Sequence, residues 1–428
     1  MADYSQSTLA LHAAYKFDTQ RTISVPIYQS TAYSFEDLAQ AEARFSLKEM
    51  GNTYSRIKNP TVAILQQRLA EVEGGIFGVC TASGMAAVFY ALLNCAQIGD
   101  TILYSNKIYG GTQTLLAHTF PKRFGIKTKE FDIDDLNSLE NLIDDSTKAI
   151  FFESLSNPQI AIADTEKITQ IAKKYGIISI CDNTVATPFL HKAFDFGVDI
   201  VVHSLSKYIN GQGNTLGGAI IERKGLNPLI KNNPRYKPFN IPDESYHGLV
   251  YASVDEQNLP IYSFRILAEW LKNIGATMSA TSAWQLLQGL ETLSLRIQKH
   301  SQNALEIAKF LQNHPNVKEV NYPGLANNPY NALLKKYFIN EQASGLLSFE
   351  ARDYEHAKSI CNKTKIFKIV ANLGDSKSLI IHPASTTHSQ LSQEELKNAQ
   401  ISPSTIRLSI GLEDAKDLIA DLDQAIRA

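Results

Sequence analysis

Two short apolar runs, each followed by polar residues, decide how this chain folds. They lie in residues 177–207, which read IISICDNTVATPFLHKAFDFGVDIVVHSLSK. The run at 177–180 leads into Cys181-Asp182-Asn183-Thr184, and the run at 199–202 leads into His203-Ser204-Leu205-Ser206-Lys207. Runs of this length, bounded by polar residues, are typical of buried strands. We therefore predict two strands of one sheet, each ending in residues that can carry chemistry.

The same pattern extends from about residue 70 to residue 223. Between most of the apolar runs lie segments with helical periodicity, for example 165–172. Strands that alternate with helices predict an α/β fold, in which a mostly parallel sheet is covered by helices on both faces. Counting the two runs above, seven strands are expected; the other five are at 75–80, 101–104, 126–131, 149–152 and 218–221.

The pattern changes on either side of this region. The first sixty residues are predicted to form an extended N-terminal arm, and 232–251, rich in Asn, Pro and Tyr, is predicted to be a long loop. Helical periodicity resumes near Tyr262, and from about residue 276 helices mix with a few strands. The expected domains are therefore an arm at 1–60, a large domain at 61–275 and a smaller α+β domain at 276–428.

The composition restricts the functional class. The 428 residues carry a formal net charge of -2, which gives no electrostatic reason to expect nucleic acid or an anionic membrane as a partner. No stretch is long and apolar enough to span a bilayer, and the amino terminus lacks the basic start and apolar run of a signal peptide. A cytoplasmic enzyme is the expectation.

The four cysteines are scattered along the chain, and none is spaced as C-x-x-C. A disulfide framework or a zinc site is not expected from that spacing, and no metal is predicted. Cys80 and Cys181 end apolar runs, so we predict that they are buried free thiols.

Small and hydroxyl-bearing residues follow the first predicted strand. Ser83-Gly84-Met85 opens a predicted helix at 86–93. Backbone N–H groups at a helix start, together with a serine hydroxyl, form an anion site. The plainer alternative is that Ser83 only caps the helix, which is the common role of such residues.

Asp182 follows the strand at 177–180. An acid in this position is most often a turn or cap residue. Its functional use would be to face a heterocyclic nitrogen, because a carboxylate beside a pyridine nitrogen favours the protonated ring and makes it a stronger electron sink.

Lys207 stands in a hydroxyl-rich turn after a buried strand and before a glycine-rich run at 211–218. Most lysines are solvated surface charges. Here, however, the hydroxyls of Ser204 and Ser206 could bind a phosphate while the Lys207 amine forms an imine. His203 has no partner in the sequence, so we predict that it is packed in the core.

These motifs resemble those of the Cys/Met-metabolism family of pyridoxal-phosphate enzymes, which have the aspartate-aminotransferase-like fold type I. The resemblance covers nearly the whole chain. It rests on Tyr54-Ser55-Arg56-Ile57-Lys58-Asn59-Pro60-Thr61, Ser83-Gly84-Met85, Tyr109-Gly110-Gly111-Thr112, Asp182-Asn183-Thr184, Ser204-Leu205-Ser206-Lys207 and Arg407-Leu408-Ser409-Ile410-Gly411-Leu412-Glu413.

The resemblance implies a role for each matching residue. Lys207 would form the Schiff base with the cofactor and then move protons, while Tyr109 would stack on the cofactor ring and assist. Asp182, followed by Thr184, would pair with the pyridine nitrogen. Arg407, assisted by Asn157 and Asn372, would grip the substrate carboxylate. The phosphate would be held by Ser83, Gly84, Met85, Ser204 and Ser206 of one subunit and by Tyr54 and Arg56 of its neighbour.

Such sharing makes a dimer the smallest working unit, and members of this family are commonly homotetramers, that is, dimers of dimers.

Within the family, three features resemble the O-acetylhomoserine sulfhydrylases. One is Ser245-Tyr246-His247-Gly248-Leu249-Val250-Tyr251. Another is the segment Asn372-Leu373-Gly374-Asp375-Ser376-Lys377 together with the segment 382–388. At the position of Lys377, cystathionine enzymes generally carry an acid instead. The third is Gly111, where methionine γ-lyases usually have a cysteine.

Two positions depart from the family pattern: Ser206 replaces a threonine, and Ala14 replaces a glycine.

The expected reaction is a γ-replacement in methionine biosynthesis, in which sulfide or methanethiol displaces acetate from O-acetyl-L-homoserine to give homocysteine or methionine. Three alternatives remain open: a methionine γ-lyase, a cystathionine γ-synthase or γ-lyase, and a regulatory protein that binds the cofactor without turnover. The sulfur donor and the acyl group of the substrate also remain open.

Overall fold

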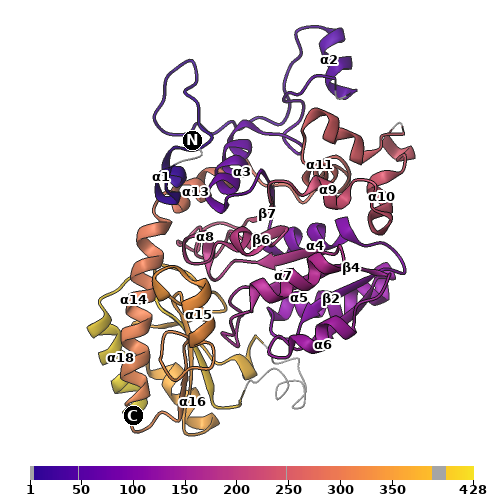
Figure 1. Ribbon diagram of the computed structural model, residues 1–428. Helices are drawn as coiled ribbons and strands as arrows, with labels where there is room; N and C mark the ends of the chain where they lie inside the picture. Colours follow the sequence, from indigo (N-terminus) through magenta and orange to yellow (C-terminus); the bar gives the residue numbers. More distant parts are fainter. Residues whose placement is uncertain (1–3, 47, 247, 388–401) are drawn as a thin grey trace. The chain divides into compact units, whose positions relative to one another are not determined.

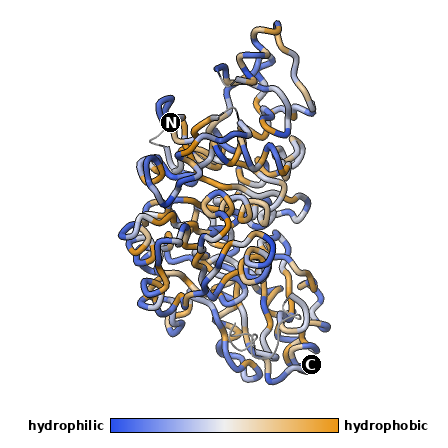
Figure 2. The backbone as a smooth tube through the Cα atoms, turned by 90° about the vertical axis from the view of Figure 1, so that its right-hand side faces the viewer, coloured by the Kyte–Doolittle hydropathy of each residue, from blue (hydrophilic) through white to orange (hydrophobic). Residues whose placement is uncertain are grey.

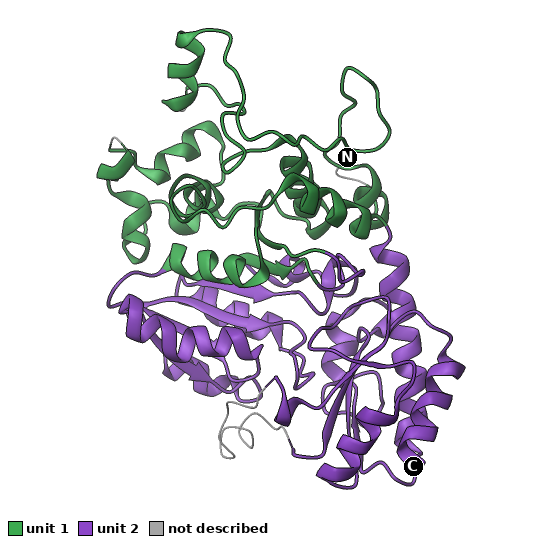
Figure 3. Cartoon of the chain, turned by 180° about the vertical axis from the view of Figure 1, so that it is seen from behind, with its two compact units in different colours: residues 1–95, 199–206, 215–291 green, residues 96–198, 207–214, 292–428 purple. Residues whose placement is uncertain are grey.

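The computed structural model describes residues 4–46, 48–246, 248–387 and 402–428. Contacts divide the chain into two compact units (Figure 3): unit 1 comprises residues 1–95, 199–206 and 215–291, and unit 2 comprises 96–198, 207–214 and 292–428. The units do not follow chain order, because strands from distant segments pair with each other. The consecutive domains expected at 1–60, 61–275 and 276–428 stay a prediction.

Unit 1 contains three strands in the order β1-β7-β6: β1 (Phe77–Thr81), β7 (Gly218–Glu222) and β6 (Ile200–Ser204). Both pairings are antiparallel. Their register places Gly218 opposite Thr81 on one side and opposite Ser204 on the other. The carboxyl ends of β1 and β6 therefore meet at the first residue of β7.

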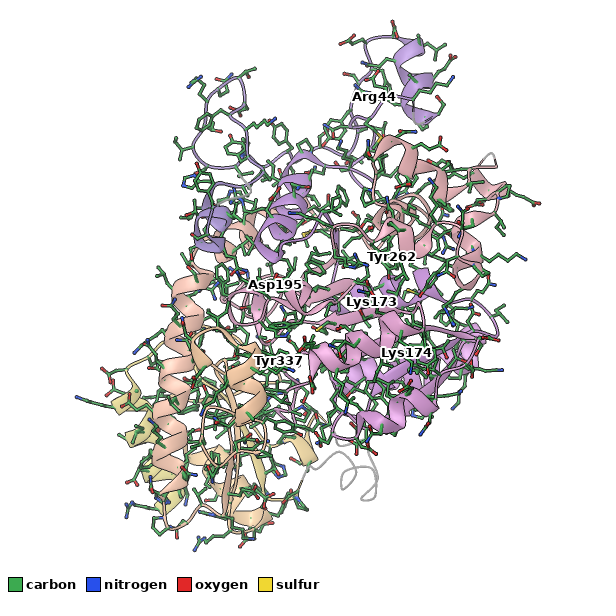
Figure 4. All side chains as sticks on the ribbon, in the orientation of Figure 1. Arg44, Lys173, Lys174, Asp195, Tyr262 and Tyr337 are labelled. Atoms are coloured by element: carbon green, nitrogen blue, oxygen red, sulfur yellow. The ribbon has the colours of Figure 1, made fainter. Side chains whose placement is uncertain are left out.

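Helices complete unit 1. The longer ones are α3 (Pro60–Glu73), α4 (Gly84–Cys95) and α13 (Ala280–Glu291). The hydroxyl of Tyr262, labelled in Figure 4, donates to Ala91 O of α4 over 2.5 Å. The shorter elements are α9 (Asn227–Ile230), α11 (Ile261–Arg265), η6 (Ile266–Leu271) and α12 (Lys272–Ile274).

Unit 2 contains four parallel strands in the order β5-β4-β2-β3: β5 (Ile178–Asp182), β4 (Thr147–Glu153), β2 (Thr101–Ser105) and β3 (Lys127–Phe131). Helices alternate with these strands, and all seven predicted strands form, so the α/β prediction is confirmed. The intervening elements are α5 (Gly110–Thr114), η1 (Leu115–Phe124), α6 (Leu136–Asn141), α7 (Thr165–Lys174), α8 (Thr187–Leu190) and η2 (Ala193–Phe196).

A second sheet in unit 2 confirms the predicted C-terminal mixture of strands and helices (Figure 1). Its order is β10 (Lys368–Ile369), β11 (Leu379–Ile381), β12 (Thr405–Ser409), β9 (Leu346–Glu350) and β8 (Glu319–Asn321). Only the β10–β11 pairing is parallel. The accompanying helices are α14 (Leu293–Gln312), α15 (Asn331–Tyr337), η7 (Ile339–Glu341), α16 (Tyr354–Lys363), η8 (Pro383–Ser385) and α18 (Ala415–Arg427).

Apolar residues account for both cores. Figure 2 shows hydrophobic stretches alternating with hydrophilic turns along the chain. The residues of β2 are all buried, as are those of β7. All four cysteines are buried and none is in a disulfide, which confirms the prediction of buried thiols for Cys80 and Cys181. None of the helices in the described part of the chain is long and apolar enough to cross a membrane.

The N-terminal segment differs from an extended arm. Helix α1 (Gln6–His12) contacts α3 and α13, and Leu9, Ala10 and Ala13 are buried. Because they are buried where α1 meets α3 and α13, these residues belong to the core of unit 1. Helix α2 (Leu38–Phe45), in contrast, has no buried residue.

The prediction of a long loop at 232–251 is wrong. This segment forms η3 (Pro234–Tyr236), α10 (Lys237–Asn240) and η4 (Glu244–Tyr246), and η5 (Tyr251–Gln257) begins at its end. The physical reason is its aromatic content: Tyr236, Phe239 and Tyr251 are buried, and the Arg265 guanidinium lies over the Phe239 and Tyr251 rings. His247 lies outside the described residues.

Asn59 holds the N-terminal segment to the body of unit 1. It is buried, and its Oδ1 accepts from Thr61 N at 3.0 Å and Val62 N at 3.4 Å, capping α3. Its Nδ2 donates to three groups of the preceding segment: Tyr28 O at 2.8 Å, Tyr33 Oη at 3.2 Å and Ser55 Oγ at 3.1 Å. One amide therefore fixes both the start of α3 and the segment that carries Tyr54 and Arg56.

We expect Asn59→Ala to lower the free energy of unfolding by about 2–4 kcal/mol, because it removes a helix cap and leaves buried polar groups without partners. Chemical denaturation measures this change. Hydrogen exchange should also become faster in residues 25–58.

Asp37→Ala is the matched control. Asp37 also caps a helix, since its side chain accepts from Gln40 N, but that helix, α2, has no buried residue. Its removal should change global stability by less than about 0.5 kcal/mol. Equal effects of the two substitutions would contradict the anchoring role of Asn59.

Candidate cofactor and substrate site

In unit 1, the Ser83 turn packs tightly against the end of β6. Ser83 Oγ accepts from Ala86 N at 3.2 Å, so Ser83 does cap α4. A Cβ added at Gly84 would lie 2.6 Å from Ser204 Cβ, and one added at Gly218 would lie 2.1 Å from Ser83 O. Only glycine fits at these two positions. The N-terminus of α4 and the Ser204 hydroxyl thus form one cradle of the kind that binds anions.

The Ser206 hydroxyl holds the glycine-rich run in place. Its Oγ accepts from Gly217 N at 3.0 Å and donates to Gly217 O at 3.3 Å. A Cβ at Gly217 would lie within 2.8 Å of Leu286 and Met278 side chains, so the run approaches α13 closely. Ser206 therefore has a structural task, and its contact with a phosphate stays a prediction.

Tyr54 and Arg56 lie together on the N-terminal segment. The Arg56 guanidinium lies over the Tyr54 ring, with its Cζ 5.5 Å from the ring centroid. Arg56 Nη1 also donates to Lys272 O. Tyr54 is exposed, so its phenol is available for contacts beyond its own chain.

In unit 2, the carboxyl ends of neighbouring strands bring two acids together. β4 ends at Glu153 and β5 ends at Asp182, and these two residues are paired in register. Asp182 Oδ1 accepts from Thr184 N at 2.9 Å, which is the expected turn interaction. Burial, and then the charge of Asp182, raises the pKa of the Glu153 carboxyl well above its usual value.

Glu153 was not among the predicted site residues, although it connects two of them. Its Oε1 accepts from Tyr109 N at 2.7 Å, and its Oε2 accepts from Asn157 N at 3.2 Å. Glu153 is only 6% exposed. The available signal was an acid at the end of an apolar run, the same signal that identified Asp182.

Lys207 lies half-buried just after the turn. Its Nζ donates to Asn372 Oδ1 at 2.7 Å. Burial, and then the positive charge of Arg407, holds the pKa of the Lys207 amine below its usual value. The backbone after Lys207 is fixed by a residue that the sequence did not suggest: Arg296 donates to Tyr208 O at 2.7 Å and to Ile209 O at 3.1 Å.

Arg407 lies on β12 and is only 5% exposed. Its Nη1 donates to Asn157 Oδ1 at 2.9 Å and its Nη2 donates to Asn372 O at 2.9 Å. Burial lowers the pKa of this guanidinium to about 10. Each terminal nitrogen keeps one further N–H, which suits a carboxylate. The structure thus brings Asn157, Asn372, Arg407 and Lys207 together.

These residue types fit pyridoxal phosphate. Unit 2 supplies an amine with a lowered pKa at Lys207, an acid at Asp182 and the Tyr109 ring, which is 48% exposed and can stack on a heterocycle. Unit 1 supplies the N-terminus of α4 and the Ser204 hydroxyl, which pack so closely that no Cβ fits at Gly84 or Gly218. In the described part of the chain, no cluster of three or more His, Cys, Asp or Glu residues is placed to hold a metal ion.

Two of the positions that distinguish subgroups of the family, Gly111 and Lys377, have defined surroundings in the structure. A Cβ at Gly111 would lie 2.5 Å from Tyr109 Cε1, so the ring rests against this glycine. Any larger residue here would push the ring away. Lys377 is exposed, and its Nζ lies 3.6 Å from Asp375 Oδ1.

His203 is buried as predicted, and its Nε2 lies 3.3 Å from Glu73 Oε1. His388 lies outside the described residues.

Comparison with known proteins identifies the family to which the chain belongs. The model of the family described as "Cys/Met metabolism PLP-dependent enzyme" matches residues 7–427. An O-acetyl-L-homoserine sulfhydrylase of Leptospira meyeri is 40% identical, covering 99% of this chain and 97% of the relative. O-acetyl-L-homoserine sulfhydrylase 1 of Thermus thermophilus is also 40% identical, covering 98% of this chain and 99% of the relative.

A solved structure shares both fold and sequence. It is a crystal structure from Campylobacter jejuni, assigned as an O-acetylhomoserine (thiol)-lyase and containing N′-pyridoxyl-lysine-5′-monophosphate. The two chains superpose with a TM-score of 0.97 at 67% identity, covering 99% of this chain and 100% of the other. With a family match over nearly its whole length, this chain belongs to the Cys/Met metabolism family of PLP-dependent enzymes.

Proposed function

We propose that this enzyme is an O-acetyl-L-homoserine sulfhydrylase, which replaces acetate by sulfide, or by methanethiol, to give homocysteine or methionine. The observation that carries the proposal is the contact series Lys207–Asn372–Arg407, which places the Lys207 amine near the buried cation of Arg407. Full-length relatives that bear this name support the choice of reaction.

Arg407 would bind the substrate α-carboxylate through its two free terminal N–H groups. The rigid support from Asn157 and Asn372 favours one orientation of the carboxylate. A fixed carboxylate also fixes which bond of the substrate α-carbon faces the cofactor ring, and this selects deprotonation over decarboxylation.

Pyridoxal phosphate, when bound, supplies an aldehyde for amine exchange and an electron sink for negative charge on substrate carbons. Asp182, with its turn held by Thr184, would keep the pyridine nitrogen protonated, and Tyr109 would stack on the ring and assist proton movement. The phosphate would be held by Ser83, Gly84, Met85, Ser204 and Ser206, with Tyr54 and Arg56 from a neighbouring subunit.

Lys207 would act first as the cofactor's attachment point and then as the base. Its lowered pKa favours the neutral amine, which is both the nucleophile and the proton acceptor. The freed amine would remove the substrate α-proton, and a second proton loss at the β-carbon would allow acetate to leave from the γ-carbon. A sulfur nucleophile then takes the place of the acetate.

A product assay tests the proposed reaction. Purified enzyme with O-acetyl-L-homoserine should form homocysteine only when sulfide is present, and Lys207→Ala should lose nearly all turnover while still binding cofactor weakly. Formation of 2-oxobutanoate and ammonia regardless of sulfide would instead indicate a γ-lyase. Uptake of pyridoxal phosphate without turnover of any activated homoserine would favour the regulatory protein, and failure to take up the cofactor would contradict the proposed function.

The proposal includes a homotetramer, a dimer of dimers in which two subunits share each site. Its support within the chain is an unusual share of exposed large apolar residues in the N-terminal segment, among them Phe17, Ile23, Leu38 and Phe45. Exposed apolar groups of this kind mark interaction surfaces. A cytoplasmic location is also proposed, because four cysteines outside any disulfide suit a reducing compartment.

Site sharing predicts complementation between two inactive variants. Arg56→Ala and Lys207→Ala should each be nearly inactive alone. In a mixed dimer, one site would combine the intact Lys207 of one chain with the intact Arg56 of the other. Randomly mixed subunits should therefore recover about one quarter of the wild-type activity. No recovery, with mixed oligomers demonstrated by mass spectrometry, would contradict a shared site.

The lowered pKa of Lys207 predicts a pH dependence in the apo-protein. A neutral amine predominates above the pKa, so Lys207 should react with an acylating reagent at lower pH than an ordinary lysine. Arg407→Met removes a positive charge and should move the midpoint of this reaction to higher pH. Mass spectrometry of the Lys207 peptide measures the midpoint, with exposed Lys224 as an internal reference. A midpoint that stays or falls would contradict the electrostatic role of Arg407.

A further inference from the structure

A small polar cavity of about 40 Å³ adjoins Arg407 within unit 2. Five of its lining residues are polar, namely Gln159, Asn321, Ser348, Thr405 and Arg407, and the remaining two are prolines. Among the described residues that line it, none is Tyr109, Lys207 or Asn372. The cavity therefore borders Arg407 but lies outside the group formed by Tyr109, Lys207 and Asn372.

The second sheet explains why this cavity is polar. The register of β8, β9 and β12 places Asn321 opposite Ser348 and Ser348 opposite Arg407. Residues that are paired across antiparallel strands share one face of the sheet, and Thr405, two residues before Arg407, shares it too. A polar row thus crosses three strands.

The segment after β4 covers this row. Asn157 Oδ1 accepts from Arg407 Nη1 at 2.9 Å, and the backbone oxygen of Gln159 accepts from Asn321 Nδ2 at 2.7 Å. These two contacts fasten residues 157–159 over the sheet. The Gln159 side chain is held beside the cavity as a result.

Two residues that line this cavity each carry a buried polar atom without a protein partner. One is Arg407 Nε, a donor, and the other is Gln159 Oε1, an acceptor. The residues that carry them are 5% and 8% exposed. Buried polar atoms are nearly always hydrogen-bonded to protein or to ordered water, and leaving them unpaired is costly.

The volume indicates what can satisfy both atoms. A site for one water needs at least about 10–15 Å³ and two to four polar partners, and this cavity offers more than that on both counts. It is too small for the amino-acid substrate. A water molecule can accept from Arg407 Nε and donate to Gln159 Oε1 at the same time.

We propose that this cavity is an ordered water site, and that Gln159 acts through the water as a positioning residue for Arg407. The Nη1 and Nη2 bonds hold the outer end of the guanidinium, and the water-mediated contact holds its inner edge. A guanidinium fixed at three points loses less conformational freedom when it binds a carboxylate. The kinetic part of this proposal rests on the proposed function, whereas the water site itself does not.

A crystal structure of the wild-type holoenzyme at high resolution tests the site directly. We expect a water peak within hydrogen-bonding distance of both Arg407 Nε and Gln159 Oε1. A dry cavity, or direct contact of Arg407 Nε with another protein group, would overturn the proposal. Crystals soaked in bromide test the other chemical class: an anomalous peak in the cavity would show an anion site and overturn the assignment to water.

Gln159→Met tests the positioning role, because methionine is similar in size but cannot accept as glutamine does. The KM for the amino-acid substrate should rise about three- to tenfold with kcat nearly unchanged, since carboxylate binding is weakened equally in the ground and transition states. The absorption spectrum of the bound cofactor should stay unchanged. An unchanged KM would overturn the role.

Gln312→Met is the matched control. Gln312 is an exposed glutamine whose Nε2 donates to Asn327 Oδ1 at 2.9 Å. This substitution should leave KM and the cofactor spectrum as they are. If no sulfide-dependent turnover is found at all, the proposed function fails, yet the crystallographic test of the water site still decides this inference.

Discussion

The buried guanidinium of Arg407 is the constraint on which the site depends. Removing a cation from water is expensive unless its hydrogen bonds are replaced, and here the replacements are amide and carbonyl oxygens rather than carboxylates. The positive charge is therefore solvated but not neutralised. In the proposed function, the carboxylate of an amino-acid substrate would supply the missing negative charge, and the uncompensated Arg407 cation would favour substrates that carry such a group.

The same charge affects the neighbouring amine. Asn372 contacts Arg407 through its backbone oxygen and Lys207 through its side chain, so the two cations are held close together. Their mutual repulsion adds to burial in favouring the neutral amine. At the ends of β4 and β5 the opposite situation holds, since two acids face each other and burial favours protonation of Glu153. Unit 2 therefore places like charges in pairs at both positions.

Much of this arrangement could be predicted from the sequence. Asp182 and Lys207 both follow apolar runs that form strands, β5 and β6, and residues just past strand ends are where an open α/β sheet usually carries its chemistry. Ser83 and the glycines near it are short-range signals of the same kind. These predictions depend on contacts between residues near each other along the chain or on a simple repeating pattern.

The rest depended on contacts between distant residues. Arg296 fixes the backbone after Lys207 from a position 88 residues away, and Gln159 matters only because β8, β9 and β12 place a polar row beneath it. The aromatic residues of 232–251 looked like a loop because their shared core requires Arg265, which comes later in the chain. Helix α1 was missed for a similar reason, since its partners are α3 and α13.

The close contact between Gly111 and the Tyr109 ring has a consequence for how this family diversifies. The ring has no side chain beneath it at this point, so its tilt is set by the size of one residue. With Tyr109 stacked on the cofactor as proposed, a substitution at Gly111 would reshape the space above the cofactor ring and leave Lys207, Asp182 and Arg407 in place. A single steric change could thus alter the preferred substrate without replacing the residues that are proposed to move protons.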